Sequence, residues 1–83
     1  MPKTGKDKRY TQKTIAFMTW LRGAMASKKV TQVELANELG ISQQALSSHM
    51  RNHIGFDYPQ LVGIFNYLDV PEEQIAKLLK TER

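Results

Sequence analysis

The sequence predicts an all-α domain of five helices. Apolar residues recur at helical spacing in several segments. Thr31 and Ser42 stand where helix N-caps are needed, and Gly40 lies between them as a helix stop. Pro59 and Pro71 suit the first turns of two further helices. We therefore expect a single domain over residues 11–83 that follows a basic N-terminal arm over residues 1–10.

The first expected helix follows this arm. Residues 1–10 contain Pro2 and Gly5 and almost no apolar side chains, so they cannot bury enough surface to offset the entropy lost on ordering. We expect the arm to be flexible. Thr11 is the expected N-cap of the helix, which should end near Ser27.

The next two helices are expected to be short. The run Thr-Gln-Val-Glu at residues 31–34 is a capping box, and Gly40 is suited to the left-handed conformation that ends a helix. The second helix therefore has only about two turns. Ser42 caps the third helix almost at once, and this helix should run to Arg51 or Asn52.

A loop over residues 52–58 is expected to fold Ile54 and Phe56 against the core. Asp57 or Tyr58 then precedes the fourth helix, with Pro59 as its first residue, and Pro71 should be the first residue of the fifth. The apolar residues of the last four helices that we expect to face inward are Val33, Leu35, Ala36, Leu39, Ala45, Leu46, Met50, Leu61, Ile64, Phe65, Leu68, Ile75, Leu78 and Leu79.

The positive charge is concentrated at the N-terminus. The chain carries a net charge of +4, and residues 1–14 hold five basic residues against Asp7 alone. Residues 15–83 hold seven basic and seven acidic residues, so they are balanced. The N-terminus therefore resembles a cationic arm suited to a phosphate backbone. An ordinary basic terminus that only aids solubility is the alternative.

Composition argues against several classes of protein. The chain has 83 residues and no cysteine, which leaves little room for a catalytic cleft and excludes a disulfide or a thiolate zinc site. We find no nucleophile beside a base and expect no enzyme activity, cofactor or metal. His49 and His53 have metal-like spacing but lack a third ligand. No apolar run approaches the ~20 residues of a membrane span, and no secretion signal is evident, so we expect a cytoplasmic protein without a membrane partner.

The second and third helices have the spacing of a helix-turn-helix. Gly40 permits a sharp turn, and small Ala36 allows the two helices to cross closely. Residues 31–47, Thr-Gln-Val-Glu-Leu-Ala-Asn-Glu-Leu-Gly-Ile-Ser-Gln-Gln-Ala-Leu-Ser, resemble the Cro and CI class of lambda repressor-like phage repressors. The resemblance is close over about 22 residues.

This resemblance implies a set of contacts with DNA. Residues of the third helix would face base edges in the major groove: Gln43, Gln44, Ser47 and Ser48. The glutamines also fit on chemical grounds, because an amide can pair bidentately with adenine. Residues at the start of the second helix and the end of the third would contact phosphates: Thr31, Gln32, Arg51 and Asn52. Arm residues would cross to the neighbouring groove: Lys6, Lys8 and Arg9.

The implied function is a sequence-specific, duplex DNA-binding transcriptional repressor. It would bind a pseudo-palindromic operator as a homodimer, with Tyr67, Val70 or Leu79 as candidate dimer contacts. Its activity would be controlled by the concentration of the protein, by proteolysis or by a competing regulator. An antitoxin that pairs with a toxin protein, or a protein-interaction module on the same scaffold, is the alternative. A protein-interaction module would be expected to carry apolar or acidic residues at the groove-facing positions.

The sequence departs from the family pattern at two sites. Met25 and Met50 stand where many members have a buried arginine and glutamate, and we expect the two methionines to touch. His49 occupies a position that is usually aliphatic. Either it is partly buried and neutral with one nitrogen hydrogen-bonded, or the helix rotates slightly and Met50 fills the space.

Overall fold

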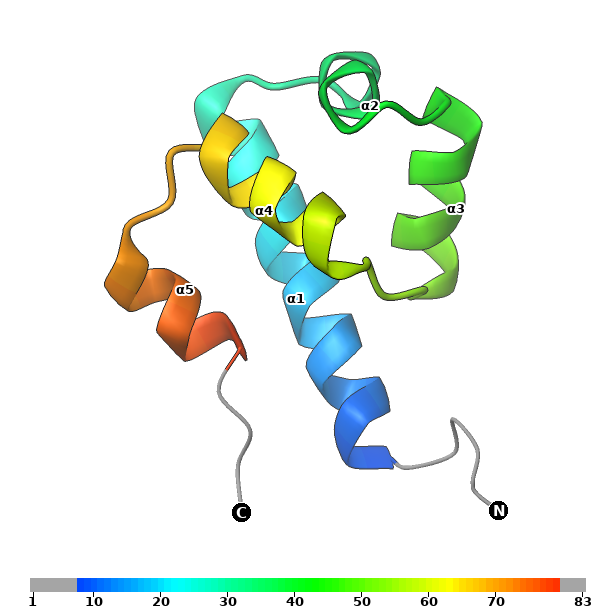
Figure 1. The fold of residues 1–83 in the computed structure, drawn as a ribbon. Coiled ribbons are helices and arrows are strands. Elements are labelled where there is room, and N and C mark those ends of the chain that lie inside the picture. The colour runs from blue at the N-terminus through cyan, green and yellow to red at the C-terminus, as the bar shows by residue number, and fades with distance from the viewer. Residues whose placement is uncertain (1–7, 80–83) are drawn as a thin grey trace.

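The computed structural model describes residues 8–79, with side chains from residue 12 onward (Figure 1). This part of the chain is helical and contains no strand. The helices are α1 (Lys8–Lys28), α2 (Gln32–Leu39), α3 (Gln43–Asn52), α4 (Tyr58–Tyr67) and α5 (Glu72–Leu79). The prediction of an all-α architecture with five helices is therefore confirmed for the described residues.

Helix α1 begins earlier than the sequence predicted. Its first residue is Lys8, so Thr11 lies inside the helix and the predicted N-cap at Thr11 is wrong. Lysine and arginine are good helix formers, and no proline or glycine occurs between Gly5 and the apolar part of the helix, so nothing interrupts it there. The expected boundary between residues 10 and 11 consequently falls within α1. Residues 1–7 of the expected arm lie outside the described part of the chain.

Helices α2 and α3 have the predicted bounds because their ends are defined by local hydrogen bonds. The Thr31 hydroxyl accepts from the Glu34 amide at 3.1 Å, and the Glu34 carboxylate accepts from the Thr31 amide at 2.8 Å. Gly40 closes α2 in the left-handed conformation with φ of 72°. Ser42 then caps α3 by accepting from the Ala45 amide at 3.0 Å.

Pro59 and Pro71 were each predicted to be the first residue of a helix, but α4 begins one residue before Pro59 and α5 one residue after Pro71. Asp57 is the N-cap of α4 and forms a capping box with Gln60, which makes Pro59 the second helical residue instead of the first. Pro71 precedes α5, and its carbonyl accepts from the amides of Gln74 and Ile75. Both prolines therefore stand where a missing amide proton removes no helical hydrogen bond.

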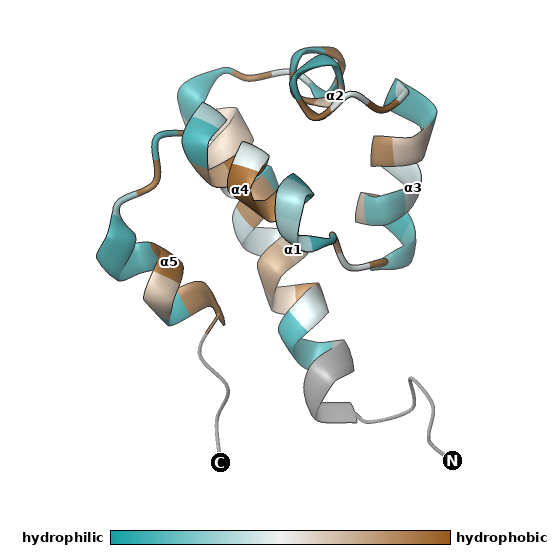
Figure 2. Cartoon of the chain, in the orientation of Figure 1, coloured by the Kyte–Doolittle hydropathy of each residue, from teal (hydrophilic) through white to brown (hydrophobic). Residues whose placement is uncertain are grey.

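The core lies where α1 to α4 meet, and hydrophobic segments of α1 and α4 overlap at the centre of Figure 2. Its buried members are Phe17, Met18, Leu21, Met25, Leu35, Ala36, Leu46, Met50, Ile64, Phe65 and Leu68. Helix α5 has no buried residue and packs on this core through partly buried Ile75 and Leu78.

Three apolar side chains expected to face inward are exposed. Val33 is 48% exposed, Ile54 47% and Leu79 50%. Only Phe56 of the two loop residues packs on the core, where its ring meets Phe17 edge-on at 6.2 Å between centroids. Phe56 fills the space beside α1, which leaves Ile54 in solvent. Val33 and Leu79 lie on the outer sides of short helices, where periodicity alone does not define the inner face.

Helix α4 approaches α2 closely at Gly63. A Cβ atom built on this glycine would lie 2.7 Å from Cδ2 of Leu39. Leu39 is partly buried and packs against the core. The absence of a side chain at residue 63 thus sets how near α4 comes to the helix that braces α3.

We expect substitutions of two glycines to have opposite effects on stability. Gly40→Ala should destabilise the fold by about 1–2 kcal/mol, because alanine is strained at positive φ. Gly23→Ala is the matched control: Gly23 lies within α1 and a methyl group there would meet open space, so alanine should stabilise by about 0.5–1 kcal/mol. Urea unfolding of both variants measures the difference. Shifts of the same sign would contradict the assignment of Gly40 to the turn.

Candidate nucleic-acid interface

Helices α2 and α3 cross at a steep angle around the turn at Gly40. In Figure 1 α2 is seen along its axis, whereas α3 lies close to the plane of the view. The Ile41 amide donates to the Ala36 carbonyl at 3.0 Å, which holds the turn against the last part of α2. Leu35 and Leu46 are fully buried behind it. This packing leaves the opposite side of α3 open to solvent.

The open side of α3 carries polar side chains. Four of them line one shallow depression, which we call the α3 depression: Gln43, Gln44, Ser47 and Arg51. Gln43, Gln44 and Arg51 are exposed, and Ser47 is partly buried. Three of the four predicted base-contacting residues therefore lie together, and the one charge among them is the cation of Arg51.

A side-chain hydrogen bond joins α2 to α3 at the edge of the α3 depression. The Ser47 hydroxyl donates to Oε1 of Gln32 at 2.6 Å. Gln32 is the first residue of α2, so the bond connects the start of one helix to the middle of the next. The sequence predicted roles for both residues but gave no sign that they touch, because the contact depends on the crossing of the helices.

The remaining predicted residues of α3 form a second pair. Asn52 donates through Nδ2 to the Ser48 hydroxyl oxygen at 3.2 Å. Ser48 does not line the α3 depression. The four predicted side chains Gln43, Gln44, Ser47 and Ser48 are therefore divided between two adjacent strips of the α3 surface.

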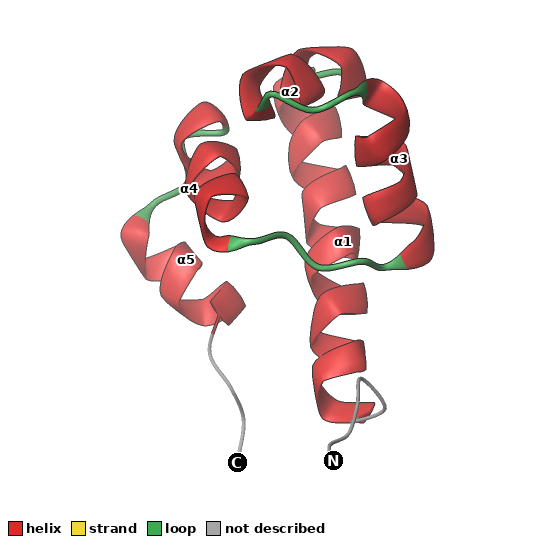
Figure 3. Cartoon of the chain, turned by 45° about the vertical axis from the view of Figure 1, so that its right-hand side comes forward, coloured by secondary structure: helices red, strands yellow, loops and turns green. Residues whose placement is uncertain are grey.

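Thr31 does not line the α3 depression. The Thr31 amide and hydroxyl both bond to the Glu34 carboxylate, at 2.8 and 3.3 Å. Lys6 lies outside the described residues, whereas Lys8 and Arg9 belong to the first turn of α1. Figure 3 shows this end of α1 extending beyond the bundle on the side where α3 ends.

Sequence reasoning missed one residue that holds α3. The Arg22 guanidinium of α1 donates to the Met50 carbonyl at 3.1 Å. This carbonyl belongs to the last turn of α3, where carbonyl groups lack intrahelical donors. Met25 and Met50, which we expected to touch, both lie in the buried core at 6% and 3% exposure. Arg22 thus bonds to the backbone of Met50, while the Met50 side chain lies among apolar residues of the core.

His49 follows the first of the two expected arrangements in its packing. It is half-buried, and its Nδ1 lies 2.9 Å from the Ile54 carbonyl oxygen. The imidazole stacks on Phe56 with a centroid separation of 4.5 Å and an interplanar angle of 8°. Met50 is buried beside it. His49 therefore anchors the loop after α3 to the helix and extends the aromatic contacts that reach Phe17.

Histidine spacing does not produce a metal-ligand cluster in the described residues. They contain no group of three His, Cys, Asp or Glu side chains that could hold a metal ion. His53 is the C-cap of α3, in the left-handed conformation with φ of 55°. It lies outside α3, so the four-residue spacing does not place both histidines on one helix face.

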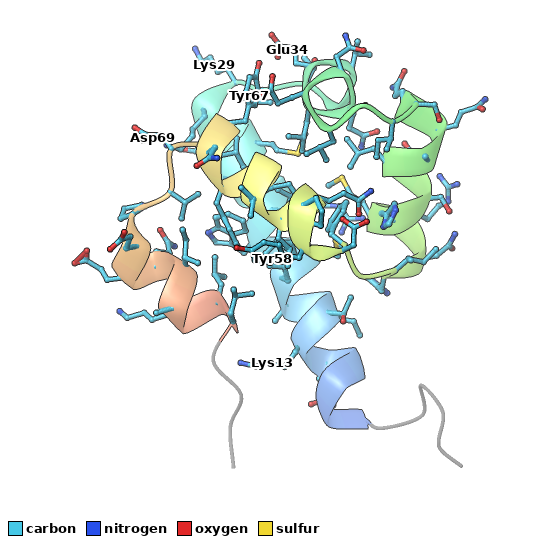
Figure 4. The ribbon with its side chains drawn as sticks, viewed as in Figure 1. Lys13, Lys29, Glu34, Tyr58, Tyr67 and Asp69 are labelled. Atoms are coloured by element: carbon cyan, nitrogen blue, oxygen red, sulfur yellow. The ribbon has the colours of Figure 1, made fainter. Side chains whose placement is uncertain are left out.

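An apolar hollow lies on the opposite part of the molecule, between α4 and α5. We call it the α4–α5 hollow, and its lining includes Tyr58, Val62 and Leu79. Of the three predicted dimer contacts, Leu79 lines this hollow, whereas Tyr67 and Val70 do not. Val70 packs against the core instead. Tyr67 lies at the other end of α4 from Tyr58, as Figure 4 shows.

Within residues 8–79, no helix combines the length and the apolar character that crossing a membrane requires. Comparisons of the chain with protein-family models, with curated proteins and with solved structures gave no significant match. The interpretation of the site therefore depends on its own geometry.

The cap at Ser42 should contribute measurably to the stability of the fold. Ser42→Ala removes the acceptor for the Ala45 amide and should cost about 1 kcal/mol. Ser42→Asp is the control, because aspartate caps as well as serine and its charge complements the helix dipole. Chemical denaturation should separate the two variants. Equal losses of stability in both would show that the cap contributes nothing.

Proposed function

We propose that the protein is a sequence-specific DNA-binding regulator that reads the major groove with α3. The observation that carries this proposal is the α3 depression, in which Gln43, Gln44, Ser47 and Arg51 lie together on the open side of a helix braced by α2. A helix presented in this way fits the width of the major groove of B-DNA.

The side chains of this face suit base recognition. Gln43 and Gln44 are exposed and have no side-chain hydrogen bond within the described residues. Each amide offers a donor and an acceptor, so it can pair with N6 and N7 of adenine. Among the described residues, no carboxylate lines the α3 depression. A surface that is polar and free of negative charge can approach DNA without the repulsion that acidic residues would cause.

Phosphate contacts would come from the two ends of the site. Arg51 supplies a cation at the last turn of α3. Gln32, at the first turn of α2, has amide protons that remain after its oxygen accepts from Ser47. A helix N-terminus also favours an anion. These contacts position the protein on the duplex, whereas the contacts of α3 specify the sequence.

We propose further that the protein binds as a homodimer on a pseudo-palindromic operator and thereby represses transcription. Helix α3 has ten residues, so one copy meets only a few base pairs. Two-fold symmetry doubles the site and separates the half-sites by about 34 Å, or one helical turn. The partners in this proposal are duplex DNA and a second copy of the chain.

A second candidate function is that of an antitoxin-type or protein-interaction module. The α4–α5 hollow favours this second function, because two of its lining residues are strongly exposed: Tyr58 by 77% and Leu79 by 50%. Exposed apolar side chains of this kind are suited to a protein partner. Under this alternative the polar face of α3 would have no role in recognition.

A binding selection from random duplex DNA distinguishes the two candidates. Full-length protein at two salt concentrations should enrich a pseudo-palindrome with half-sites about 10 base pairs apart. Weak binding that collapses with salt and enriches no sequence would instead indicate simple electrostatic association. That second result would overturn the proposed DNA-binding regulator and favour the antitoxin-type or protein-interaction module.

Substitutions within the α3 depression should separate specificity from affinity. Gln44→Ala should lose about 1–3 kcal/mol of discrimination at a single base position. Arg51→Ala should weaken binding to all sequences equally and lower the salt slope by about 1. Titrations of the selected site and of single-base variants at several salt concentrations measure both effects. If both substitutions changed only overall affinity, α3 would not be the element that reads bases.

A further inference from the structure

The hydrogen bond between α2 and α3 determines what the Ser47 hydroxyl can still offer. A serine hydroxyl has one proton to donate and two lone pairs that accept. The Ser47 proton points to Oε1 of Gln32 over a distance of 2.6 Å. Ser47 nevertheless lines the α3 depression beside Gln43 and Gln44. Toward a ligand in that depression, it therefore presents lone pairs only.

Ser48, in contrast, keeps its hydroxyl proton. Its oxygen accepts from Nδ2 of Asn52 at 3.2 Å. The Ser48 proton has no acceptor side chain among the described residues. Two adjacent serines on α3 therefore differ in what they can offer a ligand: Ser47 can only accept, whereas Ser48 keeps a proton to donate and one lone pair.

We propose that the Ser47–Gln32 hydrogen bond makes Ser47 a specificity-determining residue that selects a base carrying an exocyclic amino group. This inference rests on the proposed function and specifies the base chemistry read by the same site. Gln32 is a positioning residue in this proposal, because it acts on the base through Ser47.

The chemistry of DNA gives the proposal its selectivity. In the major groove, only the N6 amino group of adenine and the N4 amino group of cytosine donate hydrogen bonds. Phosphate oxygens only accept, so a Ser47 hydroxyl whose proton is already used cannot bond to the backbone. The favourable partner of the Ser47 hydroxyl is therefore an amino group. A keto oxygen of guanine or thymine at the same position would face the Ser47 lone pairs, and the two acceptors would repel each other. We therefore expect adenine or cytosine at one position of the half-site.

Ser48 should discriminate less sharply. Its free proton can bond to O6 of guanine, O4 of thymine, N7 of either purine, or a phosphate oxygen. Because all of these groups accept, a donor at Ser48 does not divide the bases into two classes. The amino-group preference at Ser47 is the sharper consequence of the geometry.

Gln32 links this preference to the backbone of the DNA. Its Oε1 is occupied by Ser47, which orients the amide so that its Nε2 protons remain for a phosphate. A phosphate held there would stabilise the same amide orientation that keeps the Ser47 proton away from the bases. Backbone contact and base selection would therefore reinforce each other.

The test compares binding selections with the full-length protein and three variants. Ser47→Ala locates the base position by removing its preference. At that position the unchanged protein should favour adenine or cytosine over guanine or thymine by about fivefold, which is the effect of one hydrogen bond. Gln32→Ala frees the Ser47 proton and should reduce this ratio toward one. Gln32→Glu still accepts from Ser47, so it should keep the ratio while weakening binding to every sequence through repulsion of phosphate.

A second measurement changes the DNA base instead of Gln32. Replacing the selected adenine by purine deoxynucleoside, which lacks the amino group, should weaken binding of the unchanged protein about fivefold. The same replacement should have no effect on Ser47→Ala. Circular dichroism melting of each variant checks that the fold is intact.

The outcomes separate this proposal from the one on which it rests. Two results would overturn the proposal that Ser47 selects an amino group, which we call the polarity proposal, and would leave the proposed regulator in place. In the first, the unchanged protein selects a palindromic site but prefers a keto base at the Ser47 position. In the second, Gln32→Ala keeps the base ratio of the unchanged protein. If the unchanged protein selects no sequence, the proposed function fails and the polarity proposal fails with it.

Discussion

The close crossing of α2 and α3 is the constraint on which the rest of the structure depends. Gly40 takes a conformation that other residues adopt only with strain, and this directs the chain back across α2. Leu35, Ala36 and Leu46 can then all be buried on the same side of the turn. A different turn would separate these side chains and would also change which side of α3 meets solvent. The core and the candidate interface therefore depend on the same few residues.

Three contacts made by its neighbours fix α3 along its length. At its middle, Ser47 bonds to Gln32 of α2. At its end, Arg22 of α1 bonds to a backbone carbonyl, and His49 stacks on Phe56 of the following loop. The contacts come from three different elements and leave the α3 depression uncovered. A helix held in this way can present its polar side chains in a fixed geometry, which recognition of base edges requires.

Much of the fold could be predicted because its signals are local. The capping box at Thr31, the stop at Gly40 and the cap at Ser42 each act within a few residues, so the bounds of α2 and α3 followed from the sequence. The start of α1 could not be predicted, because no cap or breaker marks it and helix propensity changes little between Lys8 and Thr11. Exposed Ile54 shows the same limitation, since the sequence does not indicate which of Ile54 and Phe56 packs on the core.

The candidate site was predictable in its members but not in its connections. The spacing of Gln43, Gln44 and Ser47 on a helix puts them on one face, which periodicity alone indicates. The bonds Ser47–Gln32 and Arg22–Met50 join residues 15 and 28 positions apart. Such contacts depend on how the helices cross, and that arrangement is a property of the assembled core.

The link between α1 and α3 has a backbone group as its acceptor. Arg22 bonds to the peptide carbonyl of Met50, which every amino acid would supply at that position. The hydrogen bond therefore depends on the identity of residue 22 and not on the identity of residue 50. The side chain at residue 50 remains free to be chosen for how it fills the core, while its backbone keeps the end of α3 attached to α1.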